Sequence, residues 1–215
     1  MELLADLADL ADGVINGNDQ RVAEITKQMI DQGTAPKAIL DDGLIAGMKV
    51  VGERFRVQDI FLPDVLLAAR AMYAGTELLR PLLIKEGIPS IGKVVIGSVQ
   101  GDLHDIGKNL VGIMLKGAGF DVIDLGNNVA PERMVQAAQE QGATVIGMSA
   151  LLTTTRPAMR KVVEMLHQEG LDDRIKTIVG GAPVSDDFAR DIGADAHGFD
   201  AASAVDRVKL LMNVS

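Results

Sequence analysis

The sequence contains no cysteine and no tryptophan among its 215 residues. Without cysteine there is no disulfide framework, no thiolate metal site and no thiol nucleophile, and an intracellular protein is expected. Any protein ligand to a metal must therefore be nitrogen or oxygen. Aromatic residues make up only 3%, whereas glycine (23) and methionine (10) are plentiful, so we expect an aliphatic interior with helices packed closely on a sheet.

Basic residues and long apolar runs are also scarce. Lysine and arginine number 21 against 30 acidic residues, which gives a formal charge of -9. Because phosphate binding needs clustered basic side chains, we expect no nucleic acid partner. No segment approaches the ~20 uninterrupted apolar residues that span a bilayer, and the opening residues lack a basic leader. We therefore expect a cytoplasmic protein with no membrane partner.

The first part of the chain repeats apolar residues at helical spacing in four segments, 3–14, 22–29, 44–55 and 62–79. Turn and cap signals separate the segments, and such short connections favour an antiparallel four-helix bundle. The stretch KEGIPSIG then interrupts the helical period. The sequence predicts a helical domain over 1–88 and a second domain over 89–215.

The second part alternates short apolar runs with helical segments. The runs are KVVIGSV, FDVIDL, ATVIGMS and KTIVGG, and a helical pattern follows each of them. Strands alternating with helices are typical of α/β proteins, and near-continuous hydrophobicity indicates strands covered on both faces. We predict a doubly wound parallel sheet of the flavodoxin or Rossmann type.

The loop after the first predicted strand, Gly101 to Gly107, is the leading candidate for chemistry, because ligands bind beyond the carboxyl ends of parallel strands. It places His104 between Asp102 and Asp105. There an imidazole can bind a metal while a carboxylate orients its other nitrogen, although a solvated or helix-capping histidine is an equal alternative. Since zinc sites recruit at least three protein ligands, a lone histidine suits a metal whose cofactor supplies the other ligands.

Two later loops offer weaker signals. Ser149, Thr153 and Thr155 follow the third predicted strand, where their hydroxyls can bind a ligand or simply begin a helix. Gly180 and Gly181 follow the fourth, where they can admit a bulky ligand or form a tight turn. The first loop lacks the GxGxxG pattern, which disfavours NAD.

In combination, the loops resemble a known domain. Asp102-x-His104-x-x-Gly107, Ser149-x-Leu151 and Gly180-Gly181 resemble the B12-binding domain of corrinoid proteins and of cobalamin-dependent methyltransferases and mutases. The string GDLHDIGKNLV is similar to the methyl-transferring branch, which includes methionine synthase and the corrinoid subunits of methanol, methylamine and aromatic O-methyl transferase systems. The string VGERFRVQDIFLPDVLLAARAM resembles the helical cap domain of that branch, so the resemblance covers nearly the whole chain.

The resemblance implies cobalamin as the cofactor, as methylcobalamin or cob(I)alamin, with His104 as the metal ligand. It implies a catalytic relay in which Asp102 binds the distal imidazole nitrogen and Thr155 replaces the serine that extends the relay in methionine synthase. The cofactor-binding residues that it implies in the α/β domain are Gly101, Asp102, Leu103, His104, Asp105, Gly107, Ser149, Leu151, Thr153, Gly180, Gly181 and Ala201.

In the helical domain the resemblance places Phe55, Leu62 and Val65 where they shield the methyl face of the corrin, and Asp41 at an acidic cofactor contact. Ordinary bundle core is the alternative for the apolar residues. His197 lies near a position where many relatives carry an aromatic residue, and it has no assigned role.

The function implied is that of a corrinoid methyl carrier, which is not expected to turn over alone. The implied partners are a substrate methyltransferase, an acceptor methyltransferase using a thiol or a tetrahydrofolate-type pterin, and a reductive activase. The methyl donor stays open between a methylamine, methanol, betaine and an aromatic methyl ether. The alternatives are a cobalamin-binding regulatory or sensor module, which would control a DNA-binding segment, and a mutase subunit, which would lack the cap.

Overall fold

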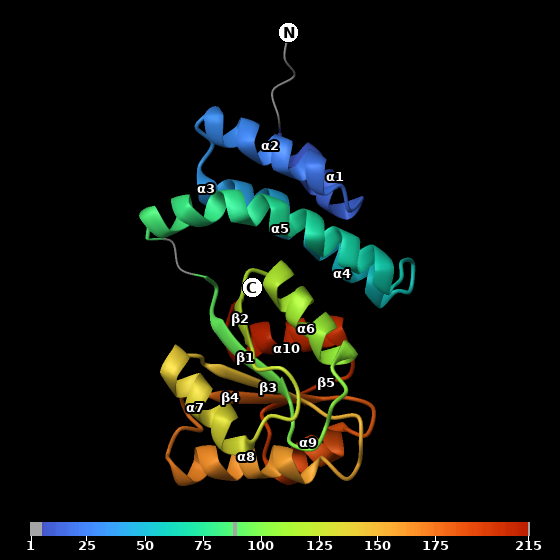
Figure 1. Ribbon diagram of the computed structural model, residues 1–215, viewed down its shortest axis with the longest axis vertical. Helices are drawn as coiled ribbons and strands as arrows, with labels where there is room; N and C mark the ends of the chain where they lie inside the picture. The colour runs from blue at the N-terminus through green and yellow to red at the C-terminus, as the bar shows by residue number, and fades with distance from the viewer. Residues whose placement is uncertain (1–5, 88–89, 215) are drawn as a thin grey trace. The chain divides into compact units, whose positions relative to one another are not determined.

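The computed structural model describes residues 6–87 and 90–214 and divides into two compact units (Figure 1). The helical unit holds the described residues up to Ser90 with Gly117–Gly119, and the α/β unit holds Ile91–Lys116 and the described residues from Phe120 onward. The domain boundary predicted between residues 88 and 89, and the predicted helical residues 3–5, lie outside the described residues. Within the described residues, no helix is both long and apolar enough to cross a membrane.

The predicted four-helix architecture of the helical unit is confirmed. Its elements are α1 (Leu7–Ile15), α2 (Asp19–Asp31), α3 (Pro36–Ala38), the π-helical segment η1 (Ile39–Ile45), α4 (Ala46–Arg56) and α5 (Leu62–Lys85). The side chains of Asp6 and Asn18 cap α1 and α2 by accepting backbone N–H bonds.

The chain's single tyrosine, Tyr73, lies on α5, where burial raises its pKa.

The third helical run is longer than its apolar repeat indicated. Helical structure starts at Pro36 rather than near Leu44, and it passes through a π-helical segment before α4. The letters DDG at 41–43 are typical of a turn, but the Cβ position of Gly43 lies 2.6 Å from Leu10 Cδ2. Close packing of this run on α1 therefore outweighs the local turn preference.

The α/β unit contains a five-stranded parallel sheet, which confirms the doubly wound prediction. The strands are β1 (Lys93–Ser98), β2 (Asp121–Asp124), β3 (Val145–Ser149), β4 (Lys176–Gly180) and β5 (Ala196–Gly198), in the order β2-β1-β3-β4-β5. The helices are α6 (Ile106–Gly117), α7 (Pro131–Gln141), α8 (Pro157–Gln168), α9 (Asp186–Ile192) and α10 (Ala201–Leu211). Strand β5 was not predicted, because Ala-His-Gly has no β-branched or long apolar residue.

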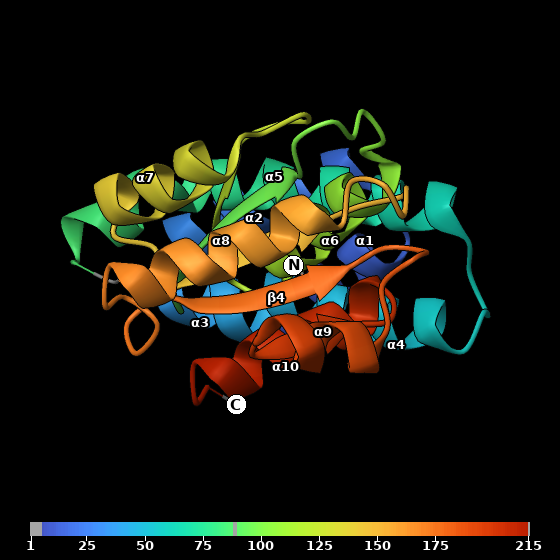
Figure 2. The same ribbon diagram turned by 90° about the horizontal axis from the view of Figure 1, so that it is seen from below.

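Helices cover both faces of this sheet (Figures 1 and 2). Helices α7, α8 and α9 share one core with the inward residues Val95, Ile146 and Val179. Helix α6 packs on the other face, where the Cβ position of Gly112 lies 2.7 Å from Ile96 Cδ1. Because β2 and β3 flank β1, the chain reverses its direction of winding beside β1, and the loops after β1 and β3 meet at this switch point.

Candidate functional site

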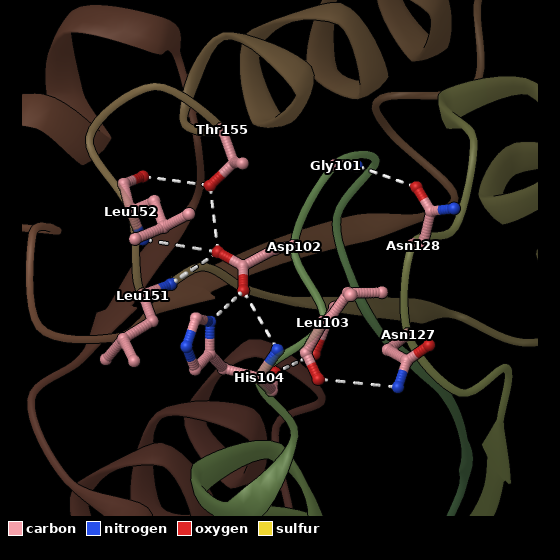
Figure 3. Close-up of polar contacts among 10 residues, drawn as sticks. Gly101, Asp102, Leu103, His104, Asn127, Asn128, Leu151, Leu152 and Thr155 are labelled. Atoms are coloured by element: carbon pink, nitrogen blue, oxygen red, sulfur yellow. Dashed lines mark hydrogen bonds and ion pairs between the residues drawn. The ribbon is translucent and has the colours of Figure 1, made fainter.

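The loop after β1 pairs a buried carboxylate with a half-exposed imidazole (Figure 3). The carboxylate of Asp102 is fully buried, whereas the side chain of His104 is 53% exposed. Asp102 Oδ1 lies 2.8 Å from His104 Nδ1 and also accepts the His104 backbone N–H at 3.1 Å. The ring of His104 is therefore held by its Nδ1 side and presents its other nitrogen outward.

This contact fixes the tautomer of the imidazole. An ionised carboxylate has only acceptor atoms, so Nδ1 must carry the proton that it shares with Asp102. A neutral ring then has its lone pair on Nε2, which forms no hydrogen bond with any described residue. A carboxylate behind the distal nitrogen also raises ligand basicity. His104 thus has an outward nitrogen that can accept a proton or a metal, and metal ligation by it stays a prediction.

The second oxygen of Asp102 connects this loop to the loop after β3. Asp102 Oδ2 accepts the N–H groups of Leu151 at 2.7 Å and Leu152 at 3.2 Å, and lies 2.9 Å from Thr155 Oγ1. Burial raises the pKa of Asp102, but the hydrogen bonds from Leu151, from the ring and N–H of His104 and from Thr155 outweigh it. The pKa of Asp102 is held well below its usual range, so this buried group stays ionised.

Thr155 is buried, and its hydroxyl has two acceptors within reach. Its Oγ1 lies 2.9 Å from Asp102 Oδ2 and 2.8 Å from the Leu152 carbonyl oxygen. A hydroxyl has one proton, so it donates to one of these oxygens at a time. When it donates to Leu152, Asp102 Oδ2 still accepts the N–H groups of Leu151 and Leu152. The hydroxyl is therefore one of three donors that face this oxygen.

A third loop, between β2 and α7, binds the backbone of the His104 loop, and the sequence analysis missed it. Asn128 donates its N–H to the Asp102 carbonyl at 2.9 Å, and its Oδ1 accepts the Gly101 N–H at 2.8 Å. Ser98, the last residue of β1, donates its hydroxyl to the His104 carbonyl at 2.6 Å. The available signal was Asn127-Asn128, two amide side chains that follow a strand at the same sheet edge.

An ion pair between a buried lysine and an exposed aspartate fixes the start of this third loop. Lys108, in the first turn of α6, is 4% exposed and lies 2.6 Å from both Asp124 Oδ1 and Asn109 Oδ1. Asp124 Oδ1 also accepts the Gly126 N–H at 2.8 Å. The first turn of α6 and the end of β2 are thus joined by one carboxylate. Breaking this pair would leave the buried Lys108 ammonium without its partner, which is costly, so we expect the pair to hold the two segments together.

The loop after β4 lies beside the loop after β3. Ser149 pairs with Gly180 across the sheet, and the Ala150 N–H donates to the Gly180 carbonyl at 3.2 Å. Gly181 has φ +117°, and a Cβ there would lie 1.9 Å from the Ala150 oxygen. Only glycine fits this approach. Sequence composition favoured a tight turn here, and the structure adds close contact between two loops of the candidate site.

The other predicted residues of the α/β unit lie at the same carboxyl edge of the sheet. Leu151 and Thr153 are exposed in the turn after β3, Gly107 has open space at its Cβ position in α6, and Ala201 is the buried first residue of α10. Asp105 precedes α6 and is partly exposed. The structure thus gathers these residues along one edge, and their contacts with a cofactor stay predictions.

The residues predicted in the helical unit differ in exposure. Val65 is fully buried, as a core residue is, whereas Phe55, near the end of α4, and Leu62, at the start of α5, are partly exposed. Asp41 lies in η1 and forms an ion pair with Lys37. Their predicted roles toward a corrin stay predictions.

Replacing the buried carboxylate should change the pH dependence of stability. Because the pKa of Asp102 is lowered on folding, its contribution is present above the unfolded pKa of about 3.9 and is lost as pH falls through the folded pKa. We expect Asp102→Asn to lower the free energy of unfolding by about 1.5–3 kcal/mol at pH 7, with a smaller difference from wild type below pH ~3. Urea unfolding at several pH values measures both quantities.

The control for this variant is Asp187→Asn, whose carboxylate is 90% exposed and pairs with Arg190 at the surface. An exposed ion pair of this kind contributes little to the free energy of unfolding, so its removal should leave that free energy nearly unchanged. If Asp102→Asn and wild type differed by the same amount at every pH, the pKa of Asp102 would not change on folding, which would contradict the prediction.

The residues around His104 suit a flat cofactor that brings its own metal ligands. Among the described residues, no group of three His, Asp or Glu side chains could hold a metal ion, so the protein offers one imidazole nitrogen. The surrounding side chains of Leu103, Ile106, Leu151 and Leu152 are exposed, with Leu103 at 68% and Ile106 at 74%. Apolar groups left in water around a ligand nitrogen favour a large, partly apolar ring system.

Comparisons with known proteins agree with this geometry. Residues 92–208 match a family described as B12 binding domain, and residues 7–80 match a second family with the same description. A corrinoid protein of Desulfitobacterium hafniense is 41% identical over 207 residues, which cover 95% of this chain and 96% of that protein. Trimethylamine corrinoid protein 1 of Methanosarcina acetivorans is 39% identical over 208 residues, covering 96% of each chain.

Among solved structures, the methanol:cobalamin methyltransferase complex from Methanosarcina barkeri contains a chain that superposes with a TM-score of 0.86. The two are 32% identical, and the match covers 97% of this chain and 80% of that one. Both the sequence relatives and this structure span the helical unit as well as the α/β unit. The chain therefore belongs to the B12-binding corrinoid proteins of methyltransferase systems, and its cofactor is cobalamin.

Proposed function

We propose that this protein carries a methyl group between two methyltransferases on cobalamin, with His104 Nε2 as the protein ligand to cobalt. The observation that carries the proposal is the Asp102–His104 pair, which leaves Nε2 as the outward donor atom. When bound, cobalamin supplies a cobalt that accepts and releases a methyl group. The protein supplies the ligand, its orientation and its protonation state.

Asp102 holds the ligand in the coordinating tautomer. Its Oδ1 accepts the Nδ1 proton, and its Oδ2 is held by three donors from the loop after β3. The Thr155 hydroxyl lies within hydrogen-bond distance of both Asp102 Oδ2 and the Leu152 carbonyl oxygen, and it links the carboxylate to the loop after β3. A proton taken up by the His104–Asp102 pair would weaken the imidazole as a donor, so the pair links ligand strength to protonation.

The names of the relatives support methyltransferase partners. One relative is a trimethylamine corrinoid protein, and a chain that superposes with a TM-score of 0.86 belongs to a methanol:cobalamin methyltransferase complex. We propose a cognate substrate methyltransferase as the loading partner. An acceptor methyltransferase that uses a thiol or a tetrahydrofolate-type pterin and a reductive activase complete the proposed system. A methylamine is the first donor to try, and methanol is the second.

The proposal is tested by methylation of the reduced, cobalamin-loaded protein. We expect no methylation from trimethylamine or methanol alone, and at least ~100-fold faster methylation with a methyltransferase specific for one of them, because the partner orients the donor. Absorbance of the cobalt chromophore follows the reaction. Methylation from a donor without any partner would contradict the proposal. Failure with every methyltransferase, together with oligomerisation that follows cobalamin state, would favour a sensor module.

A further inference from the structure

The loop between β2 and α7, residues 125–130, forms hydrogen bonds with the backbone of the loop after β1, which carries His104. It lies on the flank opposite the loop after β3. Asn128 makes two bonds to adjacent residues, since its Oδ1 accepts the Gly101 N–H at 2.8 Å and its N–H donates to the Asp102 carbonyl at 2.9 Å. Asn127 Nδ2 adds a longer contact of 3.4 Å to the Leu103 carbonyl. The residues immediately before His104 are therefore fixed to this loop (Figure 3).

The conformation of Asn128 suits this task. Its φ of +52° lies in the left-handed region, which asparagine tolerates better than other side chains. The next residue, Val129, forms a parallel bridge with Val99, and its N–H donates to the Ser98 carbonyl at 3.0 Å. The Asn128 side chain is thus held at a defined position beside the turn at Gly101.

Both ends of the loop are anchored. The Asp124–Lys108 pair fixes the end of β2 to the first turn of α6, and Ala130 precedes α7. The side chain of Asp102 is held from the other flank by Leu151, Leu152 and Thr155. Two independent sets of bonds therefore hold Asp102, one on its carboxylate and one on its backbone.

We infer that Asn128 is a positioning residue for the cobalt ligand: through Gly101 and the Asp102 carbonyl it holds the loop in the conformation in which His104 reaches cobalt. The inference rests on the proposed ligation by His104. Ligand sites require placement within about 0.5 Å, and Gly101, with φ +86°, has no side chain to restrict the backbone just before the ligand. Without the Asn128 oxygen, the Gly101 N–H loses its partner and the turn can relax.

The test compares Asn128→Gly with Asn128→Asp. Glycine accepts a φ of +52° and removes the side-chain acceptor, whereas aspartate keeps an oxygen at the same place. We expect Asn128→Gly to weaken binding of hydroxocobalamin by the full-length protein roughly 2- to 12-fold, the range for one hydrogen bond, and Asn128→Asp to bind within about twofold of wild type. Titration followed by absorbance measures the dissociation constants.

The same pair of variants in a His104→Ala background shows whether the effect passes through the ligand. If Asn128 positions His104, Asn128→Gly has no further effect once His104 is absent. Equal weakening of cobalamin binding in both backgrounds would mean that Asn128 does not act through His104. No weakening in either background would mean that the Asn128–Gly101 bond does not affect binding. Either result overturns the inference. The proposed function fails separately, if His104→Ala by itself leaves binding and the nitrogen signal of Co(II) unchanged.

Discussion

In the His104→Ala variant, the electron paramagnetic resonance spectrum of bound Co(II) cobalamin should lose the splitting from a protein nitrogen, and cobalamin affinity should fall at least ~100-fold. Mutation of a residue that only orients a metal ligand typically lowers metal affinity 10- to 100-fold. Loss of the ligand itself should therefore lower cobalamin affinity by at least as much. Alanine also leaves Asp102 Oδ1 without the ring that now lies 2.8 Å away. Uniform nitrogen-15 labelling of the protein separates a histidine signal from that of the cofactor's own base.

The matched control is His167→Ala. His167 lies on α8 with its side chain 80% exposed, and it pairs with Asp172 as His104 pairs with Asp102. Its removal should change neither the spectrum nor the affinity. A nitrogen-15 splitting that persists in His104→Ala, or one that disappears in His167→Ala, would assign the cobalt ligand to another residue.

Substitution of Gly181 should have the largest effect on folding. An alanine there must adopt φ +117° and place its Cβ 1.9 Å from the Ala150 oxygen. Backbone strain of about 1–3 kcal/mol adds to a forced displacement of similar cost, so we expect the free energy of unfolding to fall by roughly 3–5 kcal/mol. Ala150 precedes Leu151, whose N–H binds Asp102, so the displacement should also weaken cobalamin binding. Urea unfolding and cobalamin titration measure the two effects.

The control variant Gly142→Ala separates the cost of backbone strain at positive φ from the cost of the steric clash between the new Cβ and Ala150. Gly142 follows α7 with φ +64°, and nothing lies within 4 Å of its Cβ position. Its substitution should cost only about 1–2 kcal/mol, which is the left-handed penalty, and leave cobalamin affinity intact. Similar losses for the two variants would show that the loop after β3 yields easily to the added methyl group.

The sequence predicted those parts of the fold whose signal is local. Periodic apolar residues give the helices and β1 to β4, because each element is long enough to repeat its pattern. The short strand β5 carries no such pattern, and only its pairing with residues 178–180 of β4 makes it a strand. The segment η1 was obscured by turn-forming letters, since its packing on Leu10 depends on residues far away in the chain.

The candidate site divides in the same way. The loop after β1 places His104 between two carboxylates, so chemistry predicted an orienting carboxylate, and the resemblance implied that it is Asp102. The N–H donors of Leu151 and Leu152 could not be predicted, because every residue except proline has that group and only the register of β1 and β3 aims these two at Asp102. Asparagine is common in turns, so the sequence alone gives Asn128 no special role. Only the register of β1 and β2 places it beside Gly101.

The position of Tyr73 gives the molecule a built-in optical label. The chain has no tryptophan, and its single tyrosine lies on α5 of the helical unit, so intrinsic fluorescence near 305 nm, the usual emission of tyrosine, comes from that unit alone. Circular dichroism at 222 nm, where helices absorb, reports on both units. Because coincidence of different probes is the criterion for two-state unfolding, recording both signals in one denaturant titration distinguishes separate from concerted unfolding of the two units without any introduced dye.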